Sequence, residues 1–258
     1  MSSLSTYRKN VYSQNGEDGV LEEILQRLKI RTGWFVEFGA WDGKHTSNAY
    51  YLLEQGWSGV YIEADKDKYK ELVHNMKPFS EHVELLNAYV QPKGTHSLDN
   101  LLASTRINRE FAVLSIDVDS CDWQIWENLQ IYNPTVVIIE INSSIPVGIY
   151  QTHRNKKTLG SSFTATVDLG SKKGYTAVCH TGNLFFVKNS VVAQLNLPET
   201  EILFPESLFD YNWKEFSYGS LPAFTMKKLS KLRAKLSHKA RHLTAIPRRS
   251  IAVTNAQR

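Results

Sequence analysis

The stretch Trp34-Phe-Val-Glu-Phe-Gly-Ala-Trp-Asp-Gly43 decides the fold of this chain. A short apolar run ends at Glu37, and Gly39 and Gly43 follow it, which gives the pattern E-x-G-x-x-x-G. Such a run followed by glycines is typical of a buried strand that turns tightly into a helix. The pattern therefore predicts the first strand and the first turn of a nucleotide-binding sheet.

A second run repeats this scheme. Residues 59–65 read Gly-Val-Tyr-Ile-Glu-Ala-Asp, again an apolar run that ends in carboxylates. In a nucleotide-binding sheet, the acid at the tip of the second strand accepts hydrogen bonds from the two hydroxyls of a ribose. Glu63 follows Gly39 by 24 positions, close to the roughly 20 expected for that acid. We therefore expect Glu63 to hold a ribose.

The residues of the turn indicate which nucleotide is bound. Dinucleotide sites use G-x-G-x-x-G, so that bare backbone approaches a pyrophosphate, whereas Trp41 and Asp42 stand in this turn. Carboxylates at Glu37 and Asp42 would repel phosphate but suit the amino group and sulfonium of S-adenosylmethionine (SAM). Gly39 would keep the backbone open beside the methionine part. The alternative is an ordinary tight turn between a strand and a helix.

Length and composition fit one enzyme-sized domain. The chain has 258 residues, 42% hydrophobic and 22% charged, which suits an α/β domain with a full apolar core. No run of about 18 apolar residues occurs, so we expect no membrane span. Residues 1–9 lack the apolar region of a secretory signal, and the two cysteines, Cys121 and Cys179, suit a reducing compartment. We expect a cytoplasmic protein.

Apolar periodicity predicts alternating strands and helices. Strands are expected at 34–38, 59–63, 82–88, 111–116 and 136–141, and helices at 18–28, 46–55, 67–76, 97–102, 122–129 and 162–172. Two further strands, 175–180 and 184–188, are joined by a tight turn that contains Gly182, as in an antiparallel hairpin. A parallel sheet that closes with an antiparallel hairpin is the layout of the SAM-dependent methyltransferase fold, and a dehydrogenase would more often continue with parallel units.

A second group of polar residues follows strands 111–116 and 136–141. Asp117 and Asp119 come after the first of these strands, and Glu140 and Asn142 stand at the end of the second. Ligands of open α/β sheets bind outside the carboxyl ends of the strands, so we expect these four side chains to converge near the methyl donor. Helix capping and solvation are the alternatives for each residue taken singly. Asp117, Glu140 and Asn142 also offer the hard oxygen ligands that Mg²⁺ prefers.

The chain resembles the FkbM-type SAM-dependent methyltransferases over about residues 11–190. Ser-Leu-Asp-Asn-Leu, Ser-Ile-Asp-Val-Asp and Val-Ile-Ile-Glu-Ile-Asn, within 97–142, carry the resemblance. It is most similar to a branch that begins with Ser-Gln-x-Gly-Glu-Asp-Gly, here 13–19, and ends with a Lys-Lys-Gly-Tyr to Phe-Phe-Val segment, here 172–187. The resemblance implies a seven-stranded Rossmann-like methyltransferase fold and O-methylation of a sugar, a glycan or another small molecule. Asp119 and Ser120 replace the wider family's Glu and Gly, and Asp42-Gly43 departs from its common Asn-Ile-Gly.

Together, the pattern and the resemblance assign roles to individual residues. The methionine end of SAM is expected to contact the turn residues Glu37, Gly39, Asp42 and Gly43. The adenosine is expected to contact Glu63 through its ribose, Ala64 and Asp65 along its border, and Asn87 and Ala88 at its adenine. The general base that takes the proton of the acceptor hydroxyl is expected to be Asp117, Asp119 or His180. Gln14, Gly16, Glu17 and Asp18 either fold over the site or cap a helix.

The net charge of +4 is concentrated at the C-terminus. Residues 226–258 contain ten Lys and Arg residues and no Asp or Glu. Leucines recur among these cations at roughly helical spacing, at positions 229, 232, 236 and 243. The tail is expected either to be solvated or to bind an anionic membrane surface or a polyanion, which would place the protein at the membrane periphery. The expected organisation is a methyltransferase domain over 1–190, an aromatic cover segment over 191–222 and a basic tail over 223–258.

Two other functions fit the sequence. One is a non-catalytic nucleotide-binding or scaffold protein that docks through the tail. The other is an RNA methyltransferase, although no RNA-binding motif or aromatic platform accompanies the basic tail, and we do not expect a nucleic-acid partner.

Overall fold

The computed structural model describes residues 2–154 and 158–214 of the 258-residue chain. The strands are β1 (Trp34–Phe38), β2 (Ser58–Glu63), β3 (Val83–Asn87), β4 (Val113–Ile116), β5 (Val136–Glu140), β6 (Tyr175–His180) and β7 (Asn183–Lys188). The α-helices are α1 (Glu17–Arg27), α2 (Tyr50–Glu54), α3 (Lys66–Asn75), α4 (Leu98–Leu102), α5 (Asp122–Asn128), α6 (Phe163–Lys172) and α7 (Glu199–Leu203). Short 3-10 turns are η1 (Leu4–Tyr7), η2 (Lys77–Phe79), η3 (Val192–Leu195) and η4 (Pro205–Leu208).

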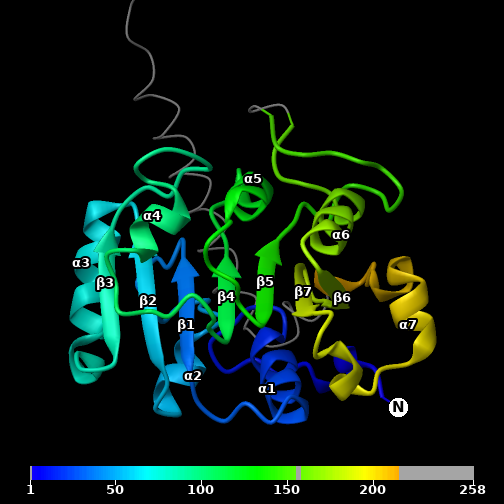
Figure 1. Ribbon diagram of the computed structural model, residues 1–258, viewed down its shortest axis with the longest axis horizontal. Coiled ribbons are helices and arrows are strands. Elements are labelled where there is room, and N and C mark those ends of the chain that lie inside the picture. The colour runs from blue at the N-terminus through cyan, green and yellow to red at the C-terminus, as the bar shows by residue number, and fades with distance from the viewer. Residues whose placement is uncertain (1, 155–157, 215–258) are drawn as a thin grey trace, which may run out of the picture. The chain divides into compact units, whose positions relative to one another are not determined.

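All seven strands form one sheet in the order β3-β2-β1-β4-β5-β7-β6 (Figure 1). Strands β1 to β5 pair in parallel, and β7 is antiparallel to both β5 and β6. This is the order and direction of strands in the Rossmann-like fold of class I SAM-dependent methyltransferases. The fold expected from the alternating pattern and the terminal hairpin is confirmed.

The sheet divides the apolar core into two layers, because successive side chains of a strand point to opposite faces. Phe35 packs in the layer that holds the apolar residues of α1, α2 and α3. Its neighbour Val36 packs in the other layer, with those of α4, α5 and α6. Both layers are fully buried around β1 and β4. Because these strands run parallel, their carboxyl ends lie at the same edge of the sheet. That edge carries the candidate site.

Two expected boundaries differ from the structure by more than one residue. The helix expected at 46–55 begins only at Tyr50, because Ser47 and Asn48 are engaged with Glu37 beneath the turn. The strand expected at 111–116 pairs only from Val113 onward.

The segment expected as a cover over the sheet packs against its outer edge. Phe209 stacks face to face on His180 at the end of β6, with ring centroids 4.5 Å apart. Leu195 of η3 is fully buried in the layer of α1. Leu195, Leu197 and Phe209 of this segment therefore add to the buried core.

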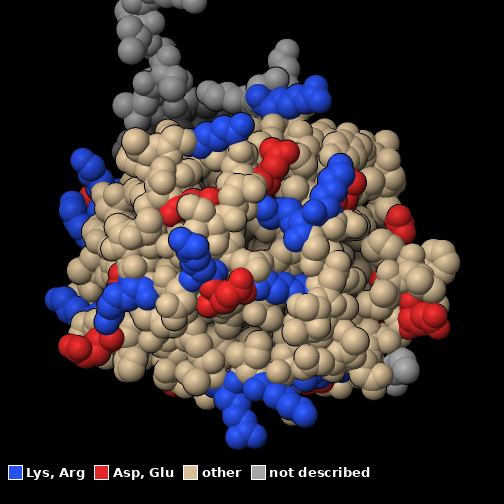
Figure 2. All heavy atoms as spheres, viewed as in Figure 1, with Lys and Arg blue, Asp and Glu red and all other residues tan. Residues whose placement is uncertain are grey.

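The chain separates into two units, Met1–Ser217 and Tyr218–Arg258. The basic tail belongs to the second unit and lies outside the described residues. Within residues 2–154 and 158–214, no helix is both long enough and apolar enough to cross a bilayer. On the face shown in Figure 2, Lys and Arg side chains are interspersed with Asp and Glu side chains.

Candidate active site

The glycine turn after β1 is required by the packing of the chain itself. Gly39 has a φ of +72°, and a Cβ there would lie 1.6 Å from the carbonyl oxygen of Asp117 at the end of β4. Gly43 has a φ of +77°, and its Cβ would lie 2.3 Å from the Leu72 side chain of α3. Positive φ and this crowding both select glycine. The turn is therefore pressed against β4 on one side and α3 on the other, while Gly39 itself stays exposed.

Glu37 lies beneath this turn. Its Oε2 accepts a hydrogen bond from the Ser47 hydroxyl at 2.5 Å, and its Oε1 accepts one from the backbone N–H of Asn48 at 2.7 Å. The Asn48 amide in turn donates to the hydroxyl of Ser115 on β4 at 3.1 Å. Glu37 is 5% exposed, and burial raises the pKa of its carboxyl to about 7. Both carboxyl oxygens are thus engaged by the chain.

Glu63 stands at the tip of β2, beside the turn. Its Oε2 accepts from the backbone N–H of Trp41 at 2.7 Å and its Oε1 from that of Asp65 at 2.7 Å. A carboxylate has about four acceptor sites, so each oxygen can still accept another hydrogen bond. Glu63 therefore joins the tip of β2 to the turn and retains the capacity to accept ribose hydroxyls.

Asp42 shapes the same turn. Its Oδ1 accepts from the backbone N–H groups of Lys44 and His45 at 3.0 and 2.8 Å, and its Oδ2 pairs with the His45 ring. Burial opposes ionisation of Asp42, but these hydrogen bonds outweigh it and lower the pKa of the carboxyl. This turn therefore contains a negatively charged carboxylate. A turn that binds phosphate would instead present hydrogen-bond donors.

The residues expected around the adenosine have local partners. Asp65 is the N-cap of α3 and accepts from the N–H groups of Asp67 and Lys68. The Asn87 amide donates to the Glu63 carbonyl at 2.8 Å, so it ties β3 to the tip of β2. Ala64 is exposed, and Ala88, half-buried, follows β3 directly. Both neighbour Glu63 at the carboxyl edge.

Three carboxylates converge after β4 and β5. Asp117, Asp119 and Glu140 each place an oxygen within 4.8 Å of the others. Burial, followed by the charges of Asp117 and Asp119, raises the pKa of Glu140 well above its ordinary value. Both effects favour the protonated form of Glu140, and a hydrogen bond with Asp117 favours it further, which reduces the repulsion within the group. Asp122 lies just below, where its carboxylate accepts from the N–H groups of Val118 and Ser120 and so fixes the loop of Asp119.

Asn142 is held by its own loop. Its Oδ1 accepts from the Ser144 hydroxyl at 2.5 Å and its Nδ2 donates to the Leu159 carbonyl at 3.0 Å. Asp119 groups with Asp117 and Glu140, whereas the role of Asn142 as a metal ligand stays a prediction.

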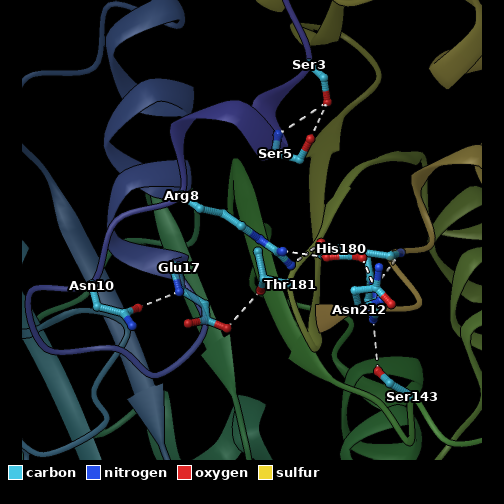
Figure 3. A network of polar contacts seen from close by, with 11 residues as sticks. Ser3, Ser5, Arg8, Asn10, Glu17, Ser143, His180, Thr181 and Asn212 are labelled. Carbon is cyan, nitrogen blue, oxygen red and sulfur yellow. Dashed lines mark hydrogen bonds and ion pairs between the residues drawn. The ribbon is translucent and has the colours of Figure 1, made fainter. Parts of the chain in front are cut away.

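His180 is built into the core, contrary to its expected role as a base (Figure 3). Its Nδ1 accepts from the backbone N–H of Asp210 at 3.1 Å, and its Nε2 therefore carries the proton and donates to the Ser143 hydroxyl at 2.9 Å. Burial lowers the pKa of His180 to about 4. The imidazole has no free lone pair at neutral pH, so this geometry gives His180 a structural role.

The opening motif ties the N-terminus to the last hairpin. Glu17 is fully buried and accepts from the Thr181 hydroxyl at 2.8 Å, as Figure 3 shows. Asp18 accepts through Oδ2 from the N–H groups of Val11, Tyr12 and Ser13 at 2.7–2.8 Å and from the Ser13 hydroxyl. Both acids thus anchor the segment before α1 and the last hairpin, and neither makes a side-chain cap of the helix. Gln14 is exposed, and Gly16 caps α1 with a left-handed backbone.

Sequence reasoning missed the polar layer below the site. Ser47, Asn48 and Ser115 connect Glu37 to β4, and Asp122 holds the loop of Asp119. Ser and Asn before a helix are a capping signal, but no local pattern indicates that they serve a buried carboxyl of another strand.

No family model and no curated protein match the chain, whereas 136 chains of solved structures do. TrmK of M. capricolum, solved with S-adenosyl-homocysteine, is 11% identical with a TM-score of 0.38, over 86% of either chain. The fibrillarin pre-rRNA processing protein of Methanococcus jannaschii is 15% identical with a TM-score of 0.41, over 61% of this chain and 66% of that one. A SAM-dependent methyltransferase of Aquifex aeolicus is 11% identical with a TM-score of 0.39, over 65% and 87%. Similarity this low leaves the activity to be argued from the chain's own residues.

Proposed function

We propose that the protein is a SAM-dependent methyltransferase. The observation that carries the proposal is the Glu63 carboxylate, which stands at the tip of β2 and accepts the Trp41 N–H of the neighbouring glycine turn at 2.7 Å. An acid in this place suits a ribose, and the carboxylate of Asp42 within the turn disfavours a pyrophosphate. A nucleoside with a cationic, phosphate-free tail satisfies both conditions.

SAM fits the groups at this edge of the sheet. Glu63 would accept its ribose hydroxyls, and the exposed Gly39 and the acidic turn would receive its methionine end. Ala64 and Ala88 would border the adenine. When bound, SAM supplies an electrophilic methyl group. The chain's part is to orient the acceptor beside it and to remove a proton.

We propose a hydroxyl acceptor, on a sugar, a glycan or another small molecule. Asp117 follows β4 with its carbonyl beside Gly39, and Asp119 belongs to the same acid group. A carboxylate within hydrogen-bond reach of a hydroxyl can take its proton. The raised pKa of Glu140 favours a protonated carboxyl there and so a negative charge on its two partners. An exposed Asp119 suits this task because it can meet an incoming acceptor.

A magnesium site is the alternative role for the same acids. Asp117, Asp119 and Glu140 offer hard oxygen ligands, and a cation could lower the pKa of an acceptor hydroxyl. A proton shared between Glu140 and Asp117 relieves the same repulsion without a metal. The proposed base is therefore favoured over the metal.

Calorimetry with SAM tests the proposal. The intact chain is expected to bind SAM, and Glu63→Ala is expected to weaken binding by about 10- to 100-fold, because hydrogen bonds to a charged acceptor are lost. Glu81→Ala removes an exposed carboxylate next to β3 and serves as the control, with unchanged affinity. Absence of SAM binding by the intact chain would refute the proposal.

The acceptor and the metal need separate measurements. A panel of sugars and small hydroxyl compounds tested for methyl uptake from labelled SAM would identify the acceptor class. Activity that survives a strong chelator, with Asp117→Asn retaining SAM binding but losing turnover, would support the base. Activity that is abolished by the chelator and restored by Mg²⁺ would support the metal.

A further inference from the structure

We propose that Glu37 is a positioning residue that fixes the cofactor turn from below through Ser47 and Asn48, and that it does not contact SAM itself. This inference rests on the proposed function, since it concerns the same turn. It reverses the expectation that the acid of the E-x-G-x-x-x-G pattern lines the methionine pocket.

The contacts of Glu37 carry the inference. Its two oxygens accept from the Ser47 hydroxyl at 2.5 Å and from the Asn48 N–H at 2.7 Å, so both ends of the carboxyl point at the far end of the turn. The Ser47 hydroxyl also accepts from the N–H of Tyr50, the first residue of α2, at 2.9 Å. One carboxyl thus closes the segment between β1 and α2 into a loop with fixed ends.

A second set of contacts locks this loop to β4. Asn48 donates to the Ser115 hydroxyl, and Ser115 stands opposite Glu37 in the parallel register of β1 and β4. The carbonyl of Asp117, two residues further along β4, lies directly under Gly39. The turn that would receive the methionine part and the strand that carries the acid group are therefore held in one hydrogen-bonded unit.

The surroundings of Glu37 make this unit sensitive to protons. Asp18 faces it from α1, and its negative charge adds to the effect of burial in raising the pKa of Glu37 to about 7. Tyr61 faces it from β2, in the register position opposite Glu37, and is fully buried. Burial, and after it the charge of Glu37, raises the pKa of Tyr61 well above its ordinary value, so Tyr61 stays neutral. Tyr50 lies beyond Tyr61 and acts on it in the same direction.

Protonation of Glu37 is expected to loosen the cofactor turn. An ionised Glu37 accepts two charge-assisted hydrogen bonds, whereas a protonated one must give up part of one of them. The turn is expected to be tight when Glu37 is ionised and looser when it is protonated. SAM carries a positive sulfonium, which also favours the ionised form. Affinity for SAM should therefore fall by about tenfold between pH 8 and pH 6, one unit above and one unit below that pKa.

The experiment compares the wild type with Glu37→Gln, which keeps the shape: its carbonyl can accept from the Asn48 N–H, and its NH2 group can donate to the Ser47 oxygen once that hydroxyl rotates. Calorimetric titration with SAM from pH 6 to pH 8 should show the tenfold change in the wild type and a change below twofold in the variant. Glu63→Gln serves as the matched control, because it is expected to lower affinity at every pH while the pH dependence remains.

Hydrogen exchange supplies a readout without cofactor. The amides of residues 39–49 in the ligand-free wild type should exchange faster at pH 6 than at pH 8, after correction for the intrinsic rate, and this difference should vanish in Glu37→Gln. An equal pH dependence of both proteins, or a wild type whose affinity does not change with pH, would overturn the inference and leave the proposed function intact. Failure of the wild type to bind SAM at any pH would remove both.

Discussion

Replacing Gly39 with alanine tests how tightly the turn is pressed against β4. The new Cβ would lie 1.6 Å from the carbonyl oxygen of Asp117, and real Cβ atoms essentially never come closer than 3.0 Å to another group. The end of β4 would therefore have to retreat by about 1.4 Å, and the atom in the way is backbone, which cannot rotate aside. Overpacking of this kind costs about 1–3 kcal/mol, and a left-handed alanine adds about 1–2 kcal/mol.

Gly56→Ala separates these two contributions. Gly56 also has a positive φ, +82°, but nothing lies within 4 Å of its Cβ position. Guanidinium unfolding is expected to show a loss of about 1–2 kcal/mol for Gly56→Ala and about 2–5 kcal/mol for Gly39→Ala. Gly39→Ala should also weaken SAM binding, because the acid group moves with β4. Equal destabilisation by both variants would refute the close contact between the turn and β4.

Three further predictions concern other parts of the chain. Burial raises the pKa of Asp122 to about 6 from an ordinary 3.8, so the folded state holds this proton more tightly and stability falls as pH rises from about 4 to about 6. The wild type should lose about 3 kcal/mol more than Asp122→Asn over this range in urea unfolding, and parallel curves would contradict the assignment. Arg8→Met removes a half-buried ion pair with Asp210 at 2.5 Å and should cost about 2 kcal/mol, whereas the fully exposed Lys70→Met should leave the unfolding midpoint unchanged. Truncation after Leu221 is expected to preserve SAM affinity but to reduce salt-sensitive binding to anionic vesicles; equal loss of SAM binding would make the tail part of the fold.

The arrangement of strands could be predicted because each parallel strand is a continuous apolar run between turn residues. The runs at β1 and β2 end in Glu37 and Glu63, and the hairpin shows itself by Gly182 between two short runs. These are local signals, and the preference for right-handed crossovers limits the sheet orders that the strands can form. Helix α2 begins later than expected because Ser47 and Asn48, which the local pattern places in the helix, donate hydrogen bonds to Glu37 of β1.

The candidate site was predictable in position but not in detail. Carboxylates after parallel strands meet at one edge whatever else the chain does, so Asp117, Asp119 and Glu140 could be grouped from the sequence. Whether a polar side chain of this edge is available to a ligand depends on its contacts with segments that are distant in the sequence. Asn142 faces Leu159, and His180 accepts from the backbone of Asp210. No periodicity in the sequence encodes such pairings.

The anchoring of the opening motif has a consequence for how the chain is synthesised and folded. Glu17 receives its hydrogen bond from Thr181, 164 positions later, and Arg8 meets Asp210 across 202 positions. Residues 8–17 are therefore synthesised long before Thr181 and Asp210, the partners that anchor them to the end of the described domain. Contacts this distant in sequence slow folding. The Oε2 of Glu17 accepts a hydrogen bond from the nearby Asn15 N–H, but its Oε1 cannot be buried without penalty before Thr181 is in place. We expect nascent chains that end before Thr181 to keep helix α1 undocked and open to protease, and docking to follow completion of the final hairpin.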